Sequence, residues 1–90
     1  MIQETSLLAY TEILENLGER QMEVYKVIAD IGPCCNTQIA QELNLPISSI
    51  TPRVGELRKK KPVMVRESHR DYCPITGRKV IFWKVSHKLN

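Results

Sequence analysis

The side chains best suited to chemistry in this 90-residue chain are cations gathered in one segment, residues 48–61. Arg53 lies inside the segment, and a basic run ends it. Arg and Lys side chains neutralise phosphates, and an Arg guanidinium also matches the two acceptors on the major-groove edge of guanine. We therefore expect Arg53 to read a base. The residues of the run that we expect to hold phosphates are Arg58, Lys59, Lys60 and Lys61.

Two alternatives explain these cations without a ligand. An ion pair with Glu56 or Glu42 would occupy the guanidinium of Arg53. Cations in the last turn of a helix also interact favourably with the helix dipole. The basic run can therefore stabilise its own helix and hold phosphates at the same time.

Two short helices joined by a tight turn would position these cations. The apolar side of the first, with Asn36 as its N-cap, consists of Ile39, Ala40, Leu43 and Leu45. Ile50, Val54 and Leu57 recur at i, i+4 and i+7, which places them on one face of the second. Asn44 can adopt the left-handed conformation that begins the turn. Two helices crossing at such a turn form a helix-turn-helix unit, whose second helix can lie in the DNA major groove.

Helix geometry, with about 100° per residue, turns small and basic side chains of the second helix away from its apolar face. The outward residues are Ser48, Pro52, Gly55 and Lys59. One flank carries Ser49, Arg53, Glu56 and Lys60, and the other carries Thr51 and Arg58. Small outward residues, Pro52 among them, permit close approach to base edges. We expect the hydroxyls of Ser48, Ser49 and Thr51 to bond phosphates or bases, with helix capping as the alternative for the two serines.

Pro52 constrains where the second helix begins. A cap at Ser48 or Ser49 would place this proline in the first turn, where it loses almost no hydrogen bond. A helix that begins earlier would lose a hydrogen bond at Pro52 and bend. We expect a late cap or a mild bend.

Two helices are expected before this unit. Thr5 or Ser6 can cap the first, which extends to about Leu17 and carries the apolar stripe Leu7, Tyr10, Leu14 and Leu17. The second extends over about residues 19–31, and its buried face is expected to consist of Val24, Val27, Ile28 and Ile31. Gly32-Pro33 ends it, because a glycine stop followed by a proline cannot continue a helix.

A β-hairpin is expected after the unit. Residues 63–67 and 79–85 are rich in β-branched and aromatic side chains, and the turn sequence Cys73–Gly77 lies between them. Ile81, Trp83 and Val85 alternate with polar or outward positions, so this face of the last strand should pack on the helices. The element order predicts an α+β, mainly α fold of four helices followed by a hairpin.

Three stretches carry a resemblance to a known family: LGERQMEVYKVIADIGP, LPISSITPRVGELRKK and YCPITGRKVIFWKV. Together they resemble the winged helix-turn-helix superfamily, including MarR-like regulators and small winged-helix proteins of bacterial and phage genomes, over about Gly18 to Val85. One departure is Lys60-Lys61-Pro62-Val63, where these relatives have a Lys-Lys-Gly-Leu type of turn. The resemblance implies double-stranded DNA binding, with a recognition helix at about 48–61 in the major groove and a wing at 66–80 on the backbone or minor groove.

Further contacts are expected at the wing and at the start of the third helix. Asn36 and Thr37 lead that helix, whose first N–H groups can receive a phosphate. Wings commonly meet the DNA backbone or the minor groove. The wing residues expected to do so are Arg70, Arg78 and Lys79.

The charge of the chain is divided between its two halves. Residues 1–33 carry a net −4, and residues 34–90 carry a net +7 with eleven bases and four acids, which together give the net +3 of the chain. A basic half that contains the helix-turn-helix indicates a surface facing a polyanion. We therefore expect a sequence-specific DNA-binding protein, serving as a transcriptional regulator or in phage DNA metabolism. The alternative is a winged-helix protein–protein assembly module that does not bind DNA.

The organisation expected is an N-terminal helix at 1–17, a winged helix-turn-helix domain at 18–85 and a short tail at 86–90. The stripe of the N-terminal helix either covers the core or pairs with a second copy. Because winged-helix DNA binders often dimerise on two half-sites, we favour a homodimer. The residues at its interface would be Leu7, Tyr10, Leu14 and Leu17.

Other chemistry is not expected. Cys34, Cys35, Cys73 and His69 include the ligand types of a Cys₃His zinc site, but adjacent cysteines lack the usual two-residue spacing. We expect Cys34 and Cys35 to be plain connection residues, Cys73 a buried or turn residue, and both histidines surface residues. No phosphate-binding loop, carboxylate pair or nucleophile elbow is present, so neither an enzyme nor a cofactor is expected. No apolar run is long enough to span a bilayer, and a cytoplasmic protein is expected.

Overall fold

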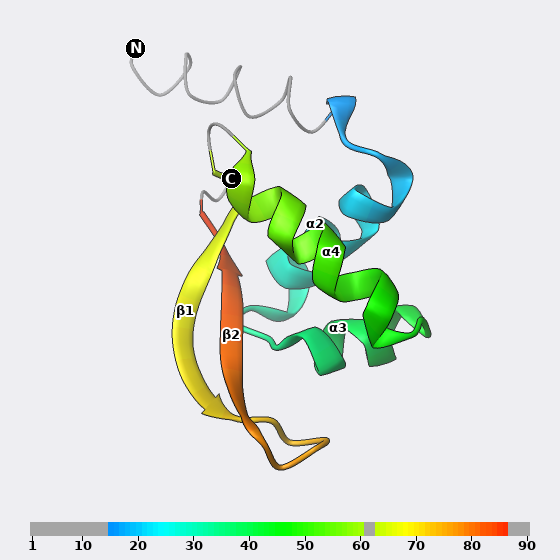
Figure 1. The fold of residues 1–90 in the computed structure, drawn as a ribbon. Helices are drawn as coiled ribbons and strands as arrows, with labels where there is room; N and C mark the ends of the chain where they lie inside the picture. Colours follow the sequence, from blue (N-terminus) through cyan, green and yellow to red (C-terminus); the bar gives the residue numbers. More distant parts are fainter. Residues whose placement is uncertain (1–14, 61–62, 87–90) are drawn as a thin grey trace.

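The computed structural model describes residues 15–60 and 63–86. This part of the chain is a small α+β fold, mainly helical, with three helices and one antiparallel hairpin (Figure 1). The helices and strands are α2 (Glu19–Ile31), α3 (Asn36–Leu43), α4 (Ile47–Lys59), β1 (Val65–Tyr72) and β2 (Lys79–Val85). In Figure 1, α4 and the hairpin lie at the front of the molecule and α2 lies behind them.

The helix α2 has the predicted boundaries. The Gln21 side chain accepts the N–H of Gly18 at 3.1 Å at its start, and Gly32 ends it with a φ of 77°, which side chains disfavour. The predicted buried residues that are confirmed are Val24, Val27 and Ile28. The prediction is wrong for Ile31, which is 43% exposed because it is the last residue of α2 and borders an open pocket. Tyr25, which was not predicted, is buried instead.

The helix α3 is capped by a residue other than the one predicted. Cys35 is the N-cap, and its N–H donates to the side chain of Gln38 at 3.0 Å. Asn36 is the first helical residue, and its amide donates to the hydroxyl of Thr51 on α4 at 3.3 Å, so the prediction of Asn36 as the N-cap is wrong. Asn44 ends the helix in the left-handed conformation, as predicted, with a φ of 55°.

The helix α4 begins earlier than a late cap would allow. Pro46 is its N-cap and Ile47 its first residue, so of the two alternatives the late cap at Ser48 or Ser49 is wrong and the earlier start, with Pro52 inside the helix, is the one observed. Pro52 is therefore an interior residue, and the carbonyl of Ser48 loses the hydrogen bond that a residue with an N–H would give it. Both residues are exposed, so water can satisfy that carbonyl. The helix ends at Lys59.

The two strands pair in a register that contains one irregularity. Val65 lies opposite Val85 and Tyr72 opposite Lys79, with a bulge between Glu67 and His69. The first strand extends to Tyr72, well past the predicted 63–67. The hairpin is also bonded to the connection between α2 and α3. Cys34 and Trp83 exchange two backbone hydrogen bonds, of 3.1 and 2.8 Å, which form an isolated bridge beside β2.

The main core lies between the three helices and the inner face of β2. Ile50, Val54 and Leu57 of α4 are buried in it as predicted. Trp83 is only 5% exposed and belongs to this core, with Ile81 and Val85 partly buried against it. The predicted packing of this face of the last strand on the helices is confirmed.

A second, smaller cluster lies apart from the main core. It consists of Cys35, Cys73 and Phe82, with Val80 partly buried against it. The ring of the exposed His69 stacks on Phe82, with centroids 5.0 Å apart. The prediction of Cys34 and Cys35 as plain connection residues is wrong, because both are fully buried and each belongs to a core cluster.

Several predictions concern residues outside the described part of the chain. The N-terminal helix lies almost entirely there, as do Leu7, Tyr10 and Leu14 of its stripe, the Lys61-Pro62 junction and His87. Leu17, the last residue of the stripe, is described, and it packs partly buried against the main core of its own chain.

The position of Pro52 predicts an effect on stability. Pro52→Ala restores the N–H that bonds the Ser48 carbonyl, so we expect the free energy of unfolding to rise by about 1–2 kcal/mol, measured by urea denaturation. Pro46→Ala is the matched control, because it relaxes the unfolded chain equally but adds no helical hydrogen bond; it should leave stability unchanged or slightly lower. A loss of stability in Pro52→Ala would contradict this account of α4.

Candidate nucleic-acid interface

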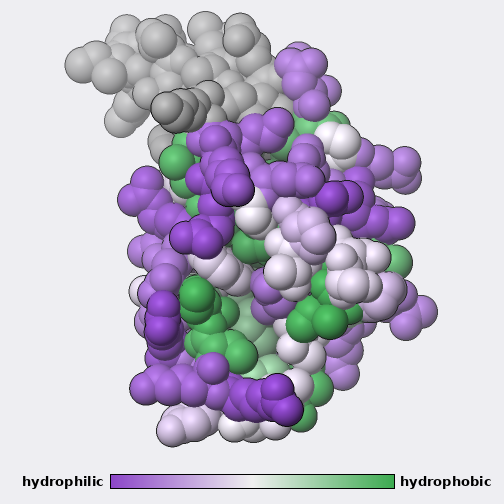
Figure 2. All heavy atoms as spheres, in the orientation of Figure 1, coloured by the Kyte–Doolittle hydropathy of each residue, from purple (hydrophilic) through white to green (hydrophobic). Residues whose placement is uncertain are grey.

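The helix α4 and the hairpin border a hollow on one face of the molecule. Figure 2 shows its apolar floor between the hairpin and the helices, with hydrophilic residues around much of its rim. The hollow has a volume of about 340 Å³. It is lined by Cys35, Asn36, Thr37, Ile47, Val80, Ile81 and Trp83. Ile47, which sequence reasoning did not single out, is 49% exposed here because it is the first residue of α4 and lies ahead of the buried stripe.

The outward face of α4 is small, polar and basic. Ser48, Pro52 and Lys59, which were predicted to point outward, are exposed, and Gly55 is half-buried. Thr51 is exposed, and its hydroxyl donates to the carbonyl of Ile47 at 3.3 Å. Ser49 and Lys60 are half-buried on the flank. No bulky apolar side chain covers this face, so a flat or convex partner can approach the helix backbone.

Arg53 is engaged within the protein. It lies on a flank of α4, where its Nη2 donates to Glu56 Oε2 at 2.9 Å and its Nε lies 2.9 Å from Oε1. The Gln21 amide of α2 donates to the same carboxylate at 2.7 Å. The Gln21 hydrogen bond, together with the charge of Arg53, holds the pKa of Glu56 below its usual value. This ion pair is the alternative role that the sequence allows for Arg53. Nothing in the sequence indicated that Gln21 bonds the same carboxylate.

Arg58 lies between α4 and the hairpin. Its guanidinium carbon is 4.7 Å from the centre of the Trp83 ring, a cation–π contact. A cation–π contact occupies the guanidinium with the face of the ring and uses none of its N–H groups as hydrogen-bond donors. Because Arg58 is exposed, those groups can still reach a phosphate.

The start of α3 contributes polar groups to the hollow. Asn36 and Thr37 are half-buried and line it. The Nδ2 of Asn36 donates to Thr51, while its buried Oδ1 has no hydrogen-bond partner. This contact joins α3 to α4, so Asn36 positions the Thr51 hydroxyl.

The hairpin carries the remaining predicted residues. Arg78 and Lys79 are exposed beside the turn, which Gly77 allows with a φ of 76°. Arg70 is exposed on β1, where its Nε lies 3.7 Å from Glu67. Among the described residues, neither Arg78 nor Lys79 has an ion-pair partner, nor do the cations at the end of α4, Arg58, Lys59 and Lys60. Bases that form no ion pair with a described residue therefore lie both on α4 and beside the hairpin turn, although the charge of Lys60 contributes to the lowered pKa of Glu56.

Two cysteines join the hairpin turn to the start of α3. The Sγ atoms of Cys35 and Cys73 are 3.5 Å apart. The N–H groups of Ile75 and Thr76 each donate to Cys73 Sγ at 3.4 Å. Burial raises the pKa of Cys73, but these donors and the Thr76 hydroxyl outweigh it and lower the pKa to about 6. Burial raises the pKa of Cys35, and that of Cys34 to about 12.

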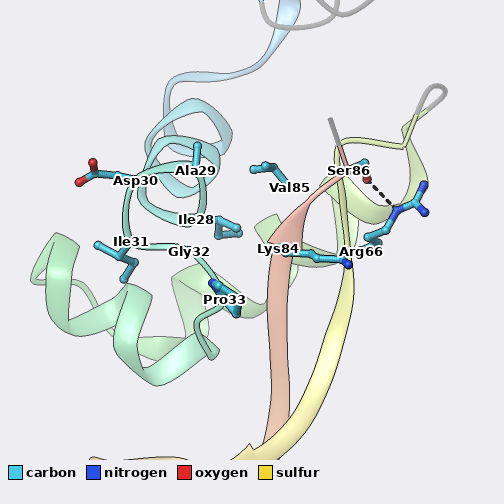
Figure 3. A pocket seen from close by; sticks show the side chains of 10 residues that line it. All are labelled: Ile28, Ala29, Asp30, Ile31, Gly32, Pro33, Arg66, Lys84, Val85 and Ser86. Atoms are coloured by element: carbon cyan, nitrogen blue, oxygen red, sulfur yellow. Dashed lines mark hydrogen bonds between the residues drawn. The ribbon is translucent and has the colours of Figure 1, made fainter. Parts of the chain in front are cut away.

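A second pocket lies away from these residues, at the end of α2. It has a volume of about 720 Å³, and none of the residues predicted to bind DNA lines it. Figure 3 shows Ile28 of α2 and Val85 of β2 pointing toward one another across it, while Asp30 points away from the strands. Arg66 donates to the Ser86 hydroxyl at 3.3 Å on its far side.

Comparisons of the chain with models of known protein families, with curated proteins and with solved structures found no match. None of the described helices is long and apolar enough to cross a membrane. In residues 15–60 and 63–86, no group of three or more Cys, His, Asp or Glu side chains is arranged to hold a metal ion. Cys34 packs in the main core, whereas Cys35 and Cys73 belong to the second cluster.

The hydrogen bonds to Cys73 predict a thiolate near neutral pH. Thiolate absorbance in the ultraviolet should show one thiol ionising at about pH 6, because the pKa of the other two is raised. Thr76→Val should move this step toward higher pH, and Thr76→Ser, which keeps the hydroxyl, should move it less. The pKa of Cys73 is lower in the folded state than in the unfolded state. The free energy of unfolding of the wild type should therefore rise relative to that of Cys73→Ser as pH rises from about 6 to 9. Absence of the step in the folded protein would refute the assignment.

Proposed function

We propose that this chain is a winged helix-turn-helix protein that binds double-stranded DNA in a sequence-specific way. In this proposal α3 and α4 form the helix-turn-helix, α4 enters the major groove, and the hairpin is the wing on the backbone or minor groove. The element order, the left-handed turn at Asn44 and the bridge that joins Cys34 to Trp83 support this fold.

One observation carries the proposal: in residues 15–60 and 63–86, bases that form no ion pair lie both at the end of α4 and beside the hairpin turn. The set consists of Arg58, Lys59, Lys60, Arg78 and Lys79. Cations near one another repel, and the helix dipole offsets this repulsion only for those in the last turn of α4, not for Arg78 and Lys79 beside the hairpin turn. A phosphate backbone following α4 and the hairpin would neutralise both groups at once.

Base reading in this proposal requires Arg53 to leave Glu56. The pair is partly exposed, with side-chain accessibilities of 35% and 41%, and exposed ion pairs contribute about 0–1 kcal/mol. A bidentate contact with guanine is worth about 1–3 kcal/mol of discrimination. The exchange is therefore favourable where a guanine faces Arg53. Ser48, Thr51 and Pro52 line the adjoining surface and complete the contact with base edges.

A second candidate rests on the hollow. An apolar floor of this size, with the half-exposed Ile47 at its edge, also suits an apolar side chain from a protein partner. In that case the protein is an assembly module and the basic rim is only a solvated surface. The two functions differ in their dependence on salt.

Binding to random duplex DNA should weaken steeply with salt. If the five unpaired bases each neutralise one phosphate, the plot of log K against log salt should have a slope of about −4 to −5, measured by fluorescence anisotropy. Lys59→Ala should weaken binding to all sequences alike and reduce the slope by about one. Lys26→Ala, an exposed lysine of α2, is the matched control and should change neither value. A flat plot, or no binding at low salt, would sink the DNA proposal and favour the assembly module.

Arg53 and Glu56 should have opposite effects on selectivity. On a site selected from random DNA, Arg53→Ala should lower affinity by roughly 5- to 150-fold, the equivalent of one bidentate base contact, and should change binding to random DNA far less. Glu56→Gln should raise affinity for the selected site, because Arg53 no longer leaves a charged partner. Equal losses on both DNAs for Arg53→Ala would show that the residue serves only the contact with α2.

A further inference from the structure

The thiol pair of Cys35 and Cys73 has no part in the proposed contact with DNA. Both side chains are 1% exposed, and their sulfur atoms are 3.5 Å apart although the residues are 38 positions apart in the chain. A disulfide needs sulfur atoms about 2.05 Å apart and Cβ atoms within about 4.5 Å. The sulfur atoms must therefore approach by roughly 1.5 Å, a shift that one exposed turn can absorb.

The surroundings of the pair give the two sulfurs different reactivity. Cys73 receives two backbone N–H groups and the Cys35 thiol, which stabilise its thiolate. Cys35 is an N-cap with a raised pKa, so it keeps its proton near neutral pH. A thiolate beside a protonated thiol is the arrangement in which one sulfur attacks an oxidant and the other resolves the product.

A small oxidant has a route to the pair. Cys35 lines the open hollow between α4 and the hairpin. Residues 74–79 of the adjoining turn are all exposed, whereas Cys73 is only 1% exposed, so an opening of this turn would uncover its sulfur. A molecule of the size of hydrogen peroxide would reach the pair from the hollow beside Cys35 or through such an opening.

We propose that Cys35 and Cys73 form a reversible intramolecular disulfide when a hydroperoxide oxidises the protein. The Cys73 thiolate attacks one oxygen of hydrogen peroxide, the O–O bond breaks, and hydroxide leaves to give a sulfenic acid on Cys73. The Cys35 sulfur then attacks that sulfenic sulfur and forms the S–S bond. The sulfenic hydroxyl leaves with the Cys35 proton as water. The two sulfurs together lose two electrons, which reduce the peroxide.

The disulfide would link the first turn of α3 to the hairpin turn. Cys35 precedes Asn36 and Thr37, and Cys73 precedes the turn that carries Arg78 and Lys79. In the reduced protein the packing of the second cluster and the hydrogen bond from the Cys35 thiol to Cys73 Sγ hold this junction. Oxidation would therefore make the attachment of the hairpin tip covalent. The inference does not depend on DNA binding.

The test is oxidation of the folded, full-length chain by hydrogen peroxide. Peptide mapping after alkylation of the remaining thiols should find one bond, Cys35 to Cys73, with Cys34 alkylated after unfolding, and dithiothreitol should restore three thiols. Cys34→Ala is the matched control, because it removes the adjacent and equally buried cysteine; it should form the same bond at a similar rate. Cys35→Ser should accumulate a sulfenic acid on Cys73 that dimedone traps.

Two further measurements distinguish oxidation of this pair from oxidation of any free thiol. The rate of Cys35–Cys73 bond formation should fall at least tenfold in the chain unfolded by urea, where the thiols are neither adjacent nor hydrogen-bonded. In Cys73→Ser, which lacks the attacking sulfur, dimedone should trap no sulfenic acid at that position and Cys35 should remain a thiol. Circular dichroism checks that each variant is folded. Absence of a Cys35–Cys73 bond in the folded wild type, or a bond that involves Cys34, would overturn the proposal whatever the DNA assays show.

Discussion

The attachment of the hairpin to the helices depends on Trp83. A two-stranded hairpin is marginally stable by itself in water, so β1 and β2 need a further partner. Trp83 makes three contacts with the rest of the molecule. Its backbone pairs with Cys34, its indole is buried in the main core, and the guanidinium of Arg58 lies over its ring. One residue thus joins the connection before α3, the hairpin and α4. The hollow beside α4 keeps its shape because Trp83 fixes one of its walls.

The orientation of Trp83 also determines what lies on the other face of β2. Successive side chains of a strand point to opposite faces, so an inward Trp83 turns Phe82 outward. Phe82 is too large to leave in water without a cost, and it is covered by the start of α3, the hairpin turn and the ring of His69. The second cluster is therefore a consequence of the first, and it brings Cys35 and Cys73 into contact.

Periodicity in the sequence predicted the elements and most of the core. The spacing of Ile50, Val54 and Leu57 was enough to orient α4, because burial of that stripe is the dominant energy of a short helix. The predictions that were wrong concern residues at which a tertiary contact overrides a local preference. Asn36 is a good N-cap, yet it bonds Thr51 across 15 residues, and Gln38 supplies the cap contact instead. Nothing local in the sequence could show that Cys35 and Cys73 meet, or that Gln21 holds Glu56.

Glu56, the acidic residue of α4, is held by contacts with Arg53 on its own helix and with Gln21 on α2. A carboxylate on a helix that faces phosphates is unfavourable unless something neutralises it, and Glu56 has both Arg53 and the Gln21 amide. Its lowered pKa means that it stays charged and keeps competing for Arg53. In the proposed complex, Lys59 and Arg58 would hold phosphates without disturbing this pair, so non-specific DNA would leave Arg53 where it is. Under the same proposal, only a bidentate acceptor at the right position would repay the removal of Arg53 from Glu56, and the cost of breaking the pair would then select against wrong sites.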